Sequence, residues 1–170
     1  MDIERNMKNE LTALDIRVYD YVQAYSETVK KLSMPMYVDS IFGEETVYLT
    51  FKDNEADPWE ENTKDLRALD LTEENLVNLG FTKKCKQEYT LLYDEYAIDV
   101  VIDDWKPLQV VVRSGLTFWK RTWNCQFVHD MQHFFYDQTK KPLKLDWNTI
   151  IAAQKAQEKS KTANRHEERK

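Results

Sequence analysis

A row of potential metal ligands occurs in the C-terminal half of the sequence. Cys125, His129, His133 and Asp137 recur every four residues, so a helix would align them along one side of its surface. Thiolate, imidazole and carboxylate groups are all zinc ligands, and two histidines one helical turn apart can share an ion. The spacing makes Cys125, His129 and His133 a candidate zinc site, and Cys125 with His129 a candidate thiolate pair.

The same row has a simpler interpretation as the polar face of a helix whose other face packs on a core. The remaining cysteine and histidine, Cys85 and His166, add no second cluster of ligands. The acidic pair Asp103-Asp104 falls in a turn-forming stretch, where carboxylates serve solvation and local hydrogen bonding. Neither of the glycine-rich nucleotide-binding motifs is present. We therefore predict a non-enzymatic protein with no catalytic residue and no cofactor.

An aromatic and basic stretch, LTFWKRTWN at residues 116–124, has the alternation of a β-strand. Alternation places Trp119, Arg121 and Trp123 on one face, where the guanidinium can stack between two indoles. With Arg113 on the neighbouring strand, this face would bind a protein or single-stranded nucleic acid. The alternative is that one face of the strand is core and the other is a partly covered outer face. The predicted binding surface consists of Trp59, Arg113, Trp119, Arg121, Trp123 and Trp147.

Residues 124–143 form the predicted helix that carries the row of ligands. Its apolar side chains fall within one arc: Phe127, Val128, Met131, Phe134 and Phe135. We predict that this arc covers an antiparallel meander of four strands, at 88–93, 96–103, 108–113 and 116–124. A shorter helix at 72–79, capped by Thr72 and ended by Gly80, precedes the meander. These elements form a predicted α-β4-α domain at residues 66–145.

The N-terminal half has the pattern of a second, smaller domain. Short alternating stretches at 14–23, 28–34, 36–42 and 46–51 predict four strands, and so small a sheet must curl to bury its apolar side. We therefore predict a small SH3-like β-barrel at residues 14–52, and an α+β fold for the whole chain. The remaining segments are a predicted N-terminal arm at 1–13, an acidic linker at 53–65 and a helical, basic tail at 146–170.

Composition and charge limit the partners and the setting. The formal net charge of -6 disfavours bulk attraction to nucleic acid or to an anionic membrane. Two cysteines fit a reducing compartment, and the first residues carry no apolar segment of a secretory signal. No apolar run is long enough to span a bilayer. We expect a cytoplasmic protein without a membrane segment.

Two motifs resemble a widespread group of uncharacterised small proteins from gut bacteria, their prophages and phages. LTEENLVNLGF at 71–81 is similar to the LTEExLxxxGF opening of that group, and FVHDMQHFFYDQTKKPL at 127–143 to its YVHxLQNLYFxLTG-like closing helix. The match covers roughly residues 70–145. It departs from the pattern at His133, where the group has asparagine, and at Lys140, where it has glycine.

The resemblance extends to a barrel strand near the N-terminus. The stretch IRVYDYV is similar to the IRIGNYV-like strand with which the group often begins, and Tyr19 replaces its usual glycine. By position, the closing motif falls on Val128, His129, Gln132 and Thr139. The resemblance implies a phage or mobile-element origin and an intracellular setting, but it brings no known chemistry.

The leading expectation is therefore a protein-binding or self-assembling protein of phage or prophage type. A virion component and an inhibitor of a host defence protein both satisfy that description. The alternative from another class is a nucleic-acid-binding module that uses the barrel, the Trp119-Arg121-Trp123 strand and the basic tail. A second alternative is a zinc-binding protein that uses the Cys125 row.

Overall fold

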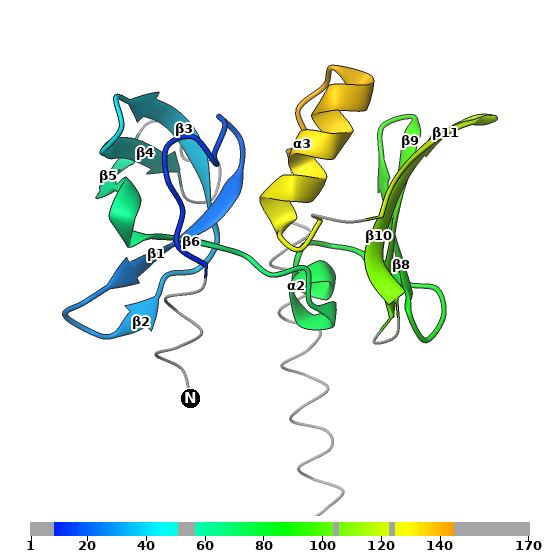
Figure 1. The fold of residues 1–170 in the computed structure, drawn as a ribbon, viewed down its shortest axis with the longest axis horizontal. Coiled ribbons are helices and arrows are strands. Elements are labelled where there is room, and N and C mark those ends of the chain that lie inside the picture. The colour runs from blue at the N-terminus through cyan, green and yellow to red at the C-terminus, as the bar shows by residue number, and fades with distance from the viewer. Residues whose placement is uncertain (1–8, 51–56, 104–105, 123–124, 145–170) are drawn as a thin grey trace, which may run out of the picture. The chain divides into compact units, whose positions relative to one another are not determined.

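The computed structural model describes residues 9–50, 57–103, 106–122 and 125–144, and Figure 1 shows its ribbon. Antiparallel sheets and two α-helices make up the described part, which confirms the predicted α+β class. The chain divides into two compact units, residues 1–71 with 121–143 and residues 72–120 with 144–170. The first unit is therefore made of two segments that are far apart in the sequence.

The first unit contains a curled antiparallel sheet (Figure 1). Its elements are β1 (Tyr21–Ser26), β2 (Lys31–Leu32), β3 (Met36–Phe42), β4 (Thr46–Thr50), β5 (Trp59–Asn62), the 3-10 helix η1 (Thr63–Asp65) and β6 (Leu66–Ala68). The path runs β2-β1-β3-β4-β5, and β6 returns to pair with β1, where Ala68 lies opposite Val22. The inner face holds a cluster of buried apolar residues that includes Val22, Val38 and Leu49.

The sheet differs from its prediction at two places. The first strand begins at Tyr21 rather than at residue 14, and it continues to Ser26, past its predicted end at residue 23. The predicted acidic linker contains β5 and η1, because Glu60 and Glu61 pair with Tyr48 and Val47 of β4. The curled sheet therefore extends past residue 52.

The second helix of the described chain, α3 (Val128–Thr139), belongs to the first unit. The predicted apolar arc is confirmed as buried, since Val128, Met131, Phe134 and Phe135 are each 6% exposed or less. Asp130 closes the start of the helix by accepting hydrogen bonds from the backbone N–H groups of Gln126 and Phe127. This grouping differs from the predicted 66–145 domain, which assigned the helix to the meander.

The second unit contains α2 (Glu73–Asn78) and a five-stranded antiparallel sheet in the order β11-β10-β9-β8-β7. Its strands are β7 (Thr82–Lys83), β8 (Glu88–Tyr93), β9 (Tyr96–Asp103), β10 (Lys106–Ser114) and β11 (Thr117–Arg121). Thr72 caps α2 by accepting a hydrogen bond from the Asn75 N–H, and Gly80 follows its end at a φ of 89°, as predicted. Buried Tyr89 and Val110 both lie opposite Val100, so one face of the sheet is core.

No helix in the described part of the chain is long and apolar enough to cross a membrane. The predicted tail at 146–170 lies outside the described residues, as do the first eight residues of the predicted arm. Leu11, at the end of that arm, is buried in the core of the first unit.

Candidate binding surfaces

Among the described residues of the second unit, the β10–β11 hairpin carries two of the exposed large apolar side chains, the third being Leu92 on β8. Leu116 at the turn is fully exposed and Phe118 is 67% exposed, and Lys120 is exposed beside them. Trp119 and Arg121 alternate with these residues and are half-buried. The Trp119 face is therefore the more covered side of β11, and the open side presents Phe118 and Lys120.

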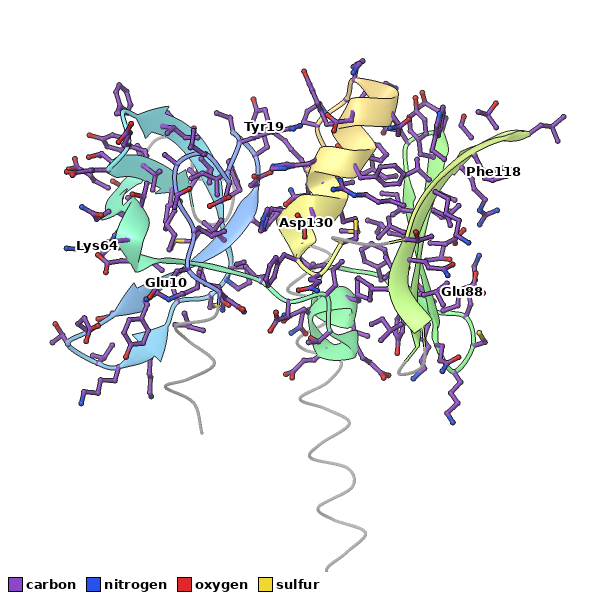
Figure 2. All side chains as sticks on the ribbon, in the orientation of Figure 1. Glu10, Tyr19, Lys64, Glu88, Phe118 and Asp130 are labelled. Carbon is purple, nitrogen blue, oxygen red and sulfur yellow. The ribbon has the colours of Figure 1, made fainter. Side chains whose placement is uncertain are left out.

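The outer edge of β11 is also unpaired within the described residues. The sheet order ends at β11, whose neighbour is β10. Figure 2 shows Phe118 on the part of the hairpin that projects beyond the rest of its sheet. An edge strand presents backbone N–H and C=O groups to which another strand can pair. The hairpin thus combines exposed apolar side chains with a row of available backbone groups.

Arg113 is occupied by an ion pair within its own sheet. Its Nε lies 2.5 Å from Oδ2 of the buried Asp99, which also accepts hydrogen bonds from Lys84 Nζ at 3.3 Å and from the Thr90 hydroxyl. Burial opposes ionisation of Asp99, but these partners outweigh it and hold the pKa of the carboxyl below its usual value. Arg113 therefore pairs with Asp99 on the neighbouring strand β9 and does not extend the Trp119 surface.

The remaining residues of the predicted surface are placed elsewhere. Trp59 lies on β5 in the first unit, is 64% exposed, and donates a hydrogen bond from Nε1 to Glu61 at 3.2 Å. Trp123 and Trp147 lie outside the described residues. The surface is therefore described as two parts, Trp59 in one unit and the β10–β11 hairpin in the other.

The predicted zinc row does not assemble a metal site. Cys125 is 1% exposed, and burial raises the pKa of its thiol to about 12, so the sulfur is a protonated thiol at neutral pH. His129 is also buried and stacks on Phe127 at 5.5 Å between ring centroids. Nowhere in the described residues do three His, Cys, Asp or Glu side chains gather as a metal-binding group. The same burial disfavours the thiolate form that the predicted pair of Cys125 with His129 requires.

His133 instead makes a contact that the sequence analysis missed. Its Nε2 lies 2.6 Å from Oδ2 of Asp20, a side chain that is itself 3% exposed. The same carboxylate oxygen accepts the backbone N–H of Arg17 at 2.7 Å, which fixes the turn before β1. One helical turn further on, Arg17 pairs with Asp137 at 3.0 Å. The polar row of α3 is therefore the side that contacts the N-terminal turn.

Gln132 connects the same two segments through buried hydrogen bonds. Its Oε1 accepts the Tyr21 N–H at 2.9 Å, and its Nε2 donates to the carbonyls of Tyr19 at 2.8 Å and Leu143 at 3.0 Å. The Tyr19 backbone has a φ of 77°, which is the left-handed region. The turn and the helix are thus joined by backbone groups as well as by the Asp20–His133 pair.

A pocket of about 490 Å³ opens beside this contact, entirely within the first unit. Its lining includes Tyr19, Asp20, His133, Tyr136 and Lys140. None of the described residues that line it is a serine, threonine or cysteine. The sequence analysis singled out His133 of this lining, but as a candidate zinc ligand and not as the partner of Asp20.

No protein-family model, curated protein or solved structure matches this chain. What bears on function is therefore the chemistry of the exposed hairpin and of the pocket beside α3.

Proposed function

We propose that this protein is a non-enzymatic binding protein that associates through its β10–β11 hairpin, with a second copy of the chain as its partner. The observation that supports this most directly is the exposure of Leu116 at the turn and of Phe118 on β11, whose outer edge pairs with no strand in the described part of the chain. Covering such side chains contributes roughly 1.5–3 kcal/mol each. Strand pairing along β11 would add backbone hydrogen bonds in the same contact.

The pattern of reactive groups supports a binding role over catalysis. An imidazole held by a buried carboxylate, as in the Asp20–His133 pair, is an arrangement that general bases share. A hydrolase or transferase of that design also needs a positioned nucleophile. The buried thiol of Cys125 is protonated, and the described lining of the pocket offers no hydroxyl or thiol of serine, threonine or cysteine. In this proposal the pair holds α3 against the N-terminal turn.

We also propose that the first unit is an SH3-like barrel. The meander β1-β3-β4-β5, the 3-10 helix η1 after β5, and the return of β6 to pair with β1 support this assignment. A barrel of this kind is a rigid scaffold that carries loops and edges for recognition. Such a unit fits a protein that acts by contact.

The setting we propose is that of a phage or prophage protein in the host cytoplasm or in a virion. Its support is the sequence resemblance of residues 70–145, whose two motifs contain α2 and α3. A virion component and an inhibitor of a host defence protein both act by contact. Either role requires an exposed surface such as the hairpin.

The experiment is a measurement of mass by native mass spectrometry and sedimentation over a range of concentrations of the full chain. We expect oligomers whose fraction rises with concentration and falls at least tenfold in Phe118→Lys. The matched control is Leu92→Lys, because Leu92 is 77% exposed on β8 of the same sheet and away from the hairpin edge. A wild-type chain that stays monomeric throughout, or a Phe118→Lys chain that associates like wild type, would overturn the proposal.

Nucleic-acid binding is the second candidate, because the exposed Phe118 and Lys120 share the open side of β11 and offer a base a stacking surface next to positive charge. It predicts an affinity for single-stranded oligonucleotides that falls steeply as salt rises. Fluorescence anisotropy of a labelled oligonucleotide at two salt concentrations tests it. No binding at low salt would remove this candidate.

A further inference from the structure

A groove of about 460 Å³ opens on the first unit between the β1–β2 hairpin and the end of β5. Tyr25, Val29 and Leu32 line it from the hairpin, and Trp59 lines it from β5. Several of these side chains remain in contact with solvent, since Val29 is 62% exposed, Leu32 38% and Trp59 64%. We call this site the hairpin groove. Its apolar lining is partly exposed to solvent, because no other described segment covers it.

The charges around the hairpin groove have one prevailing sign. Among the described residues that line it, Glu27, Glu61 and Asp65 are acidic and Lys31 is the one cation. A ligand that fills the groove therefore meets apolar walls and an excess of carboxylates. The complementary chemistry is an apolar plug flanked by lysine or arginine.

The β10–β11 hairpin has that complementary chemistry. Leu116 and Phe118 are its exposed apolar side chains, and Lys120 and Arg121 follow them on the same strand. No acidic residue occurs between Ser114 and Arg121. The hairpin is thus apolar at its tip and positively charged behind it, the reverse of the groove.

We infer that the hairpin groove of one copy of this chain accepts the β10–β11 hairpin of a second copy. The inference rests on the proposed function and names the surface that the hairpin contacts. Because donor and acceptor are different surfaces of the same chain, the contact is head-to-tail and joins the hairpin of one copy to the groove of another.

Two lysine substitutions separate the donor from the acceptor. Leu32→Lys adds a positive charge to the groove wall and repels the basic hairpin, while the hairpin of that variant stays intact. Phe118→Lys removes the plug and leaves the groove intact. Leu32 and Phe118 are both partly or largely exposed, so each variant folds. We expect each variant alone to be monomeric at concentrations where wild type associates.

The deciding measurement is the mass of an equimolar mixture of the two variants. The intact hairpin of Leu32→Lys fits the intact groove of Phe118→Lys, whereas the opposite contact joins two altered surfaces that are both more positive. The mixture should therefore form a one-to-one heterodimer and nothing larger, visible by native mass spectrometry when one variant is isotopically labelled. Leu14→Lys and Leu92→Lys are the matched controls, since Leu14 and Leu92 are 96% and 77% exposed and lie outside the hairpin groove.

The outcomes separate this inference from the proposed function. If Phe118→Lys is monomeric but Leu32→Lys associates like wild type, the groove is not the acceptor and the proposed function stands. If both variants are monomeric and their mixture forms no heterodimer, the contact is not head-to-tail and the inference fails. If both variants associate like wild type, the proposed function fails along with it.

Discussion

The carboxylate of Asp20 lies 2.6 Å from Nε2 of His133, although the two residues are 113 positions apart in the chain. This pair joins the turn before β1 to the middle of α3, and the whole of the second unit's sheet lies between them in sequence. Gln132, the preceding residue of the helix, bonds to the backbone of the same turn. The N-terminal turn and α3 are therefore joined by two polar contacts, the Asp20–His133 pair and the hydrogen bonds of the Gln132 amide.

Replacing the amide of Gln132 should lower the free energy of unfolding. Gln132→Leu deprives the Tyr21 N–H and the carbonyls of Tyr19 and Leu143 of their partner, and an unsatisfied buried group costs about 1–3 kcal/mol. We expect the free energy of unfolding in urea to fall by about 3 kcal/mol. Gln138→Leu on the same helix is the control, with a change within about 0.5 kcal/mol. Equal effects of the two substitutions would contradict this account.

The contribution of the Asp20–His133 pair to stability can be measured by a double-mutant cycle. Asp20→Ala, His133→Ala and the double variant should give a coupling energy of about 1–2 kcal/mol, because Asp20 is buried and the contact is short. The comparison cycle is Arg17→Ala with Asp137→Ala, whose side chains are both 48% exposed and whose coupling should stay below about 1 kcal/mol. A coupling near zero for the first pair would show that its contact adds nothing to folding.

His129 should make the stability of the protein depend on pH. Burial lowers the pKa of His129, and neighbouring Asp130, Asp20 and Asp15 oppose that shift, while His133 adds to it. Because the folded chain takes up this proton less readily than the unfolded chain, the unfolding free energy decreases as the pH falls below the ordinary histidine value of 6.5 and levels off below the folded pKa.

The slope from this one proton approaches about 1.4 kcal/mol per pH unit. His129→Phe should remove this contribution to the pH dependence of the unfolding free energy. Urea unfolding over about two pH units, between about pH 7 and about pH 5, measures it. An unchanged slope in the variant would assign the pH dependence to other groups.

Substitution of Tyr19 by glycine and by alanine should change the stability of the protein by different amounts. Its φ of 77° places a side chain where a left-handed backbone costs about 1–2 kcal/mol. Both substitutions remove the ring that lies 6.4 Å from Tyr37, but only glycine relieves the backbone. Tyr19→Gly should therefore be more stable than Tyr19→Ala by about 1 kcal/mol in thermal or urea unfolding. The reverse order would place the turn in another conformation.

The meander and its preceding helix could be predicted from the sequence because their signals are local. Short turn-forming connections separate Glu88–Tyr93 from Tyr96–Asp103, and both strands have the predicted bounds. Thr72 and Gly80 define the ends of α2 through their own backbone preferences. Signals of this kind depend only on residues that are close in sequence.

The contacts of α3 could not be predicted in the same way. Its apolar arc shows that Phe134 and Phe135 are buried, but a periodic pattern does not identify the surface that covers them. Likewise, Asp20 occurs in an alternating stretch that reads as strand, and nothing local connects it with His133. Strand β5 was missed because Glu60 and Glu61 are atypical of strands, and their pairing depends on β4.

Lys140 at the end of α3 repeats the situation of Tyr19. Its φ of 59° is also left-handed. Two side chains thus occupy conformations that glycine adopts at no cost, one in the turn before β1 and one at the end of α3. Neither left-handed conformation was predicted from the sequence.

The split composition of the first unit has a consequence for synthesis on the ribosome. Residues 9–71 emerge first, yet the helix that shields Asp20 and satisfies the Tyr21 amide is translated only after the second unit's sheet. Until α3 has been synthesised, the N-terminal strands lack the contacts that Gln132 and His133 make with Tyr21 and Asp20. The helix that completes the first unit therefore leaves the exit tunnel after the whole of the second unit's sheet.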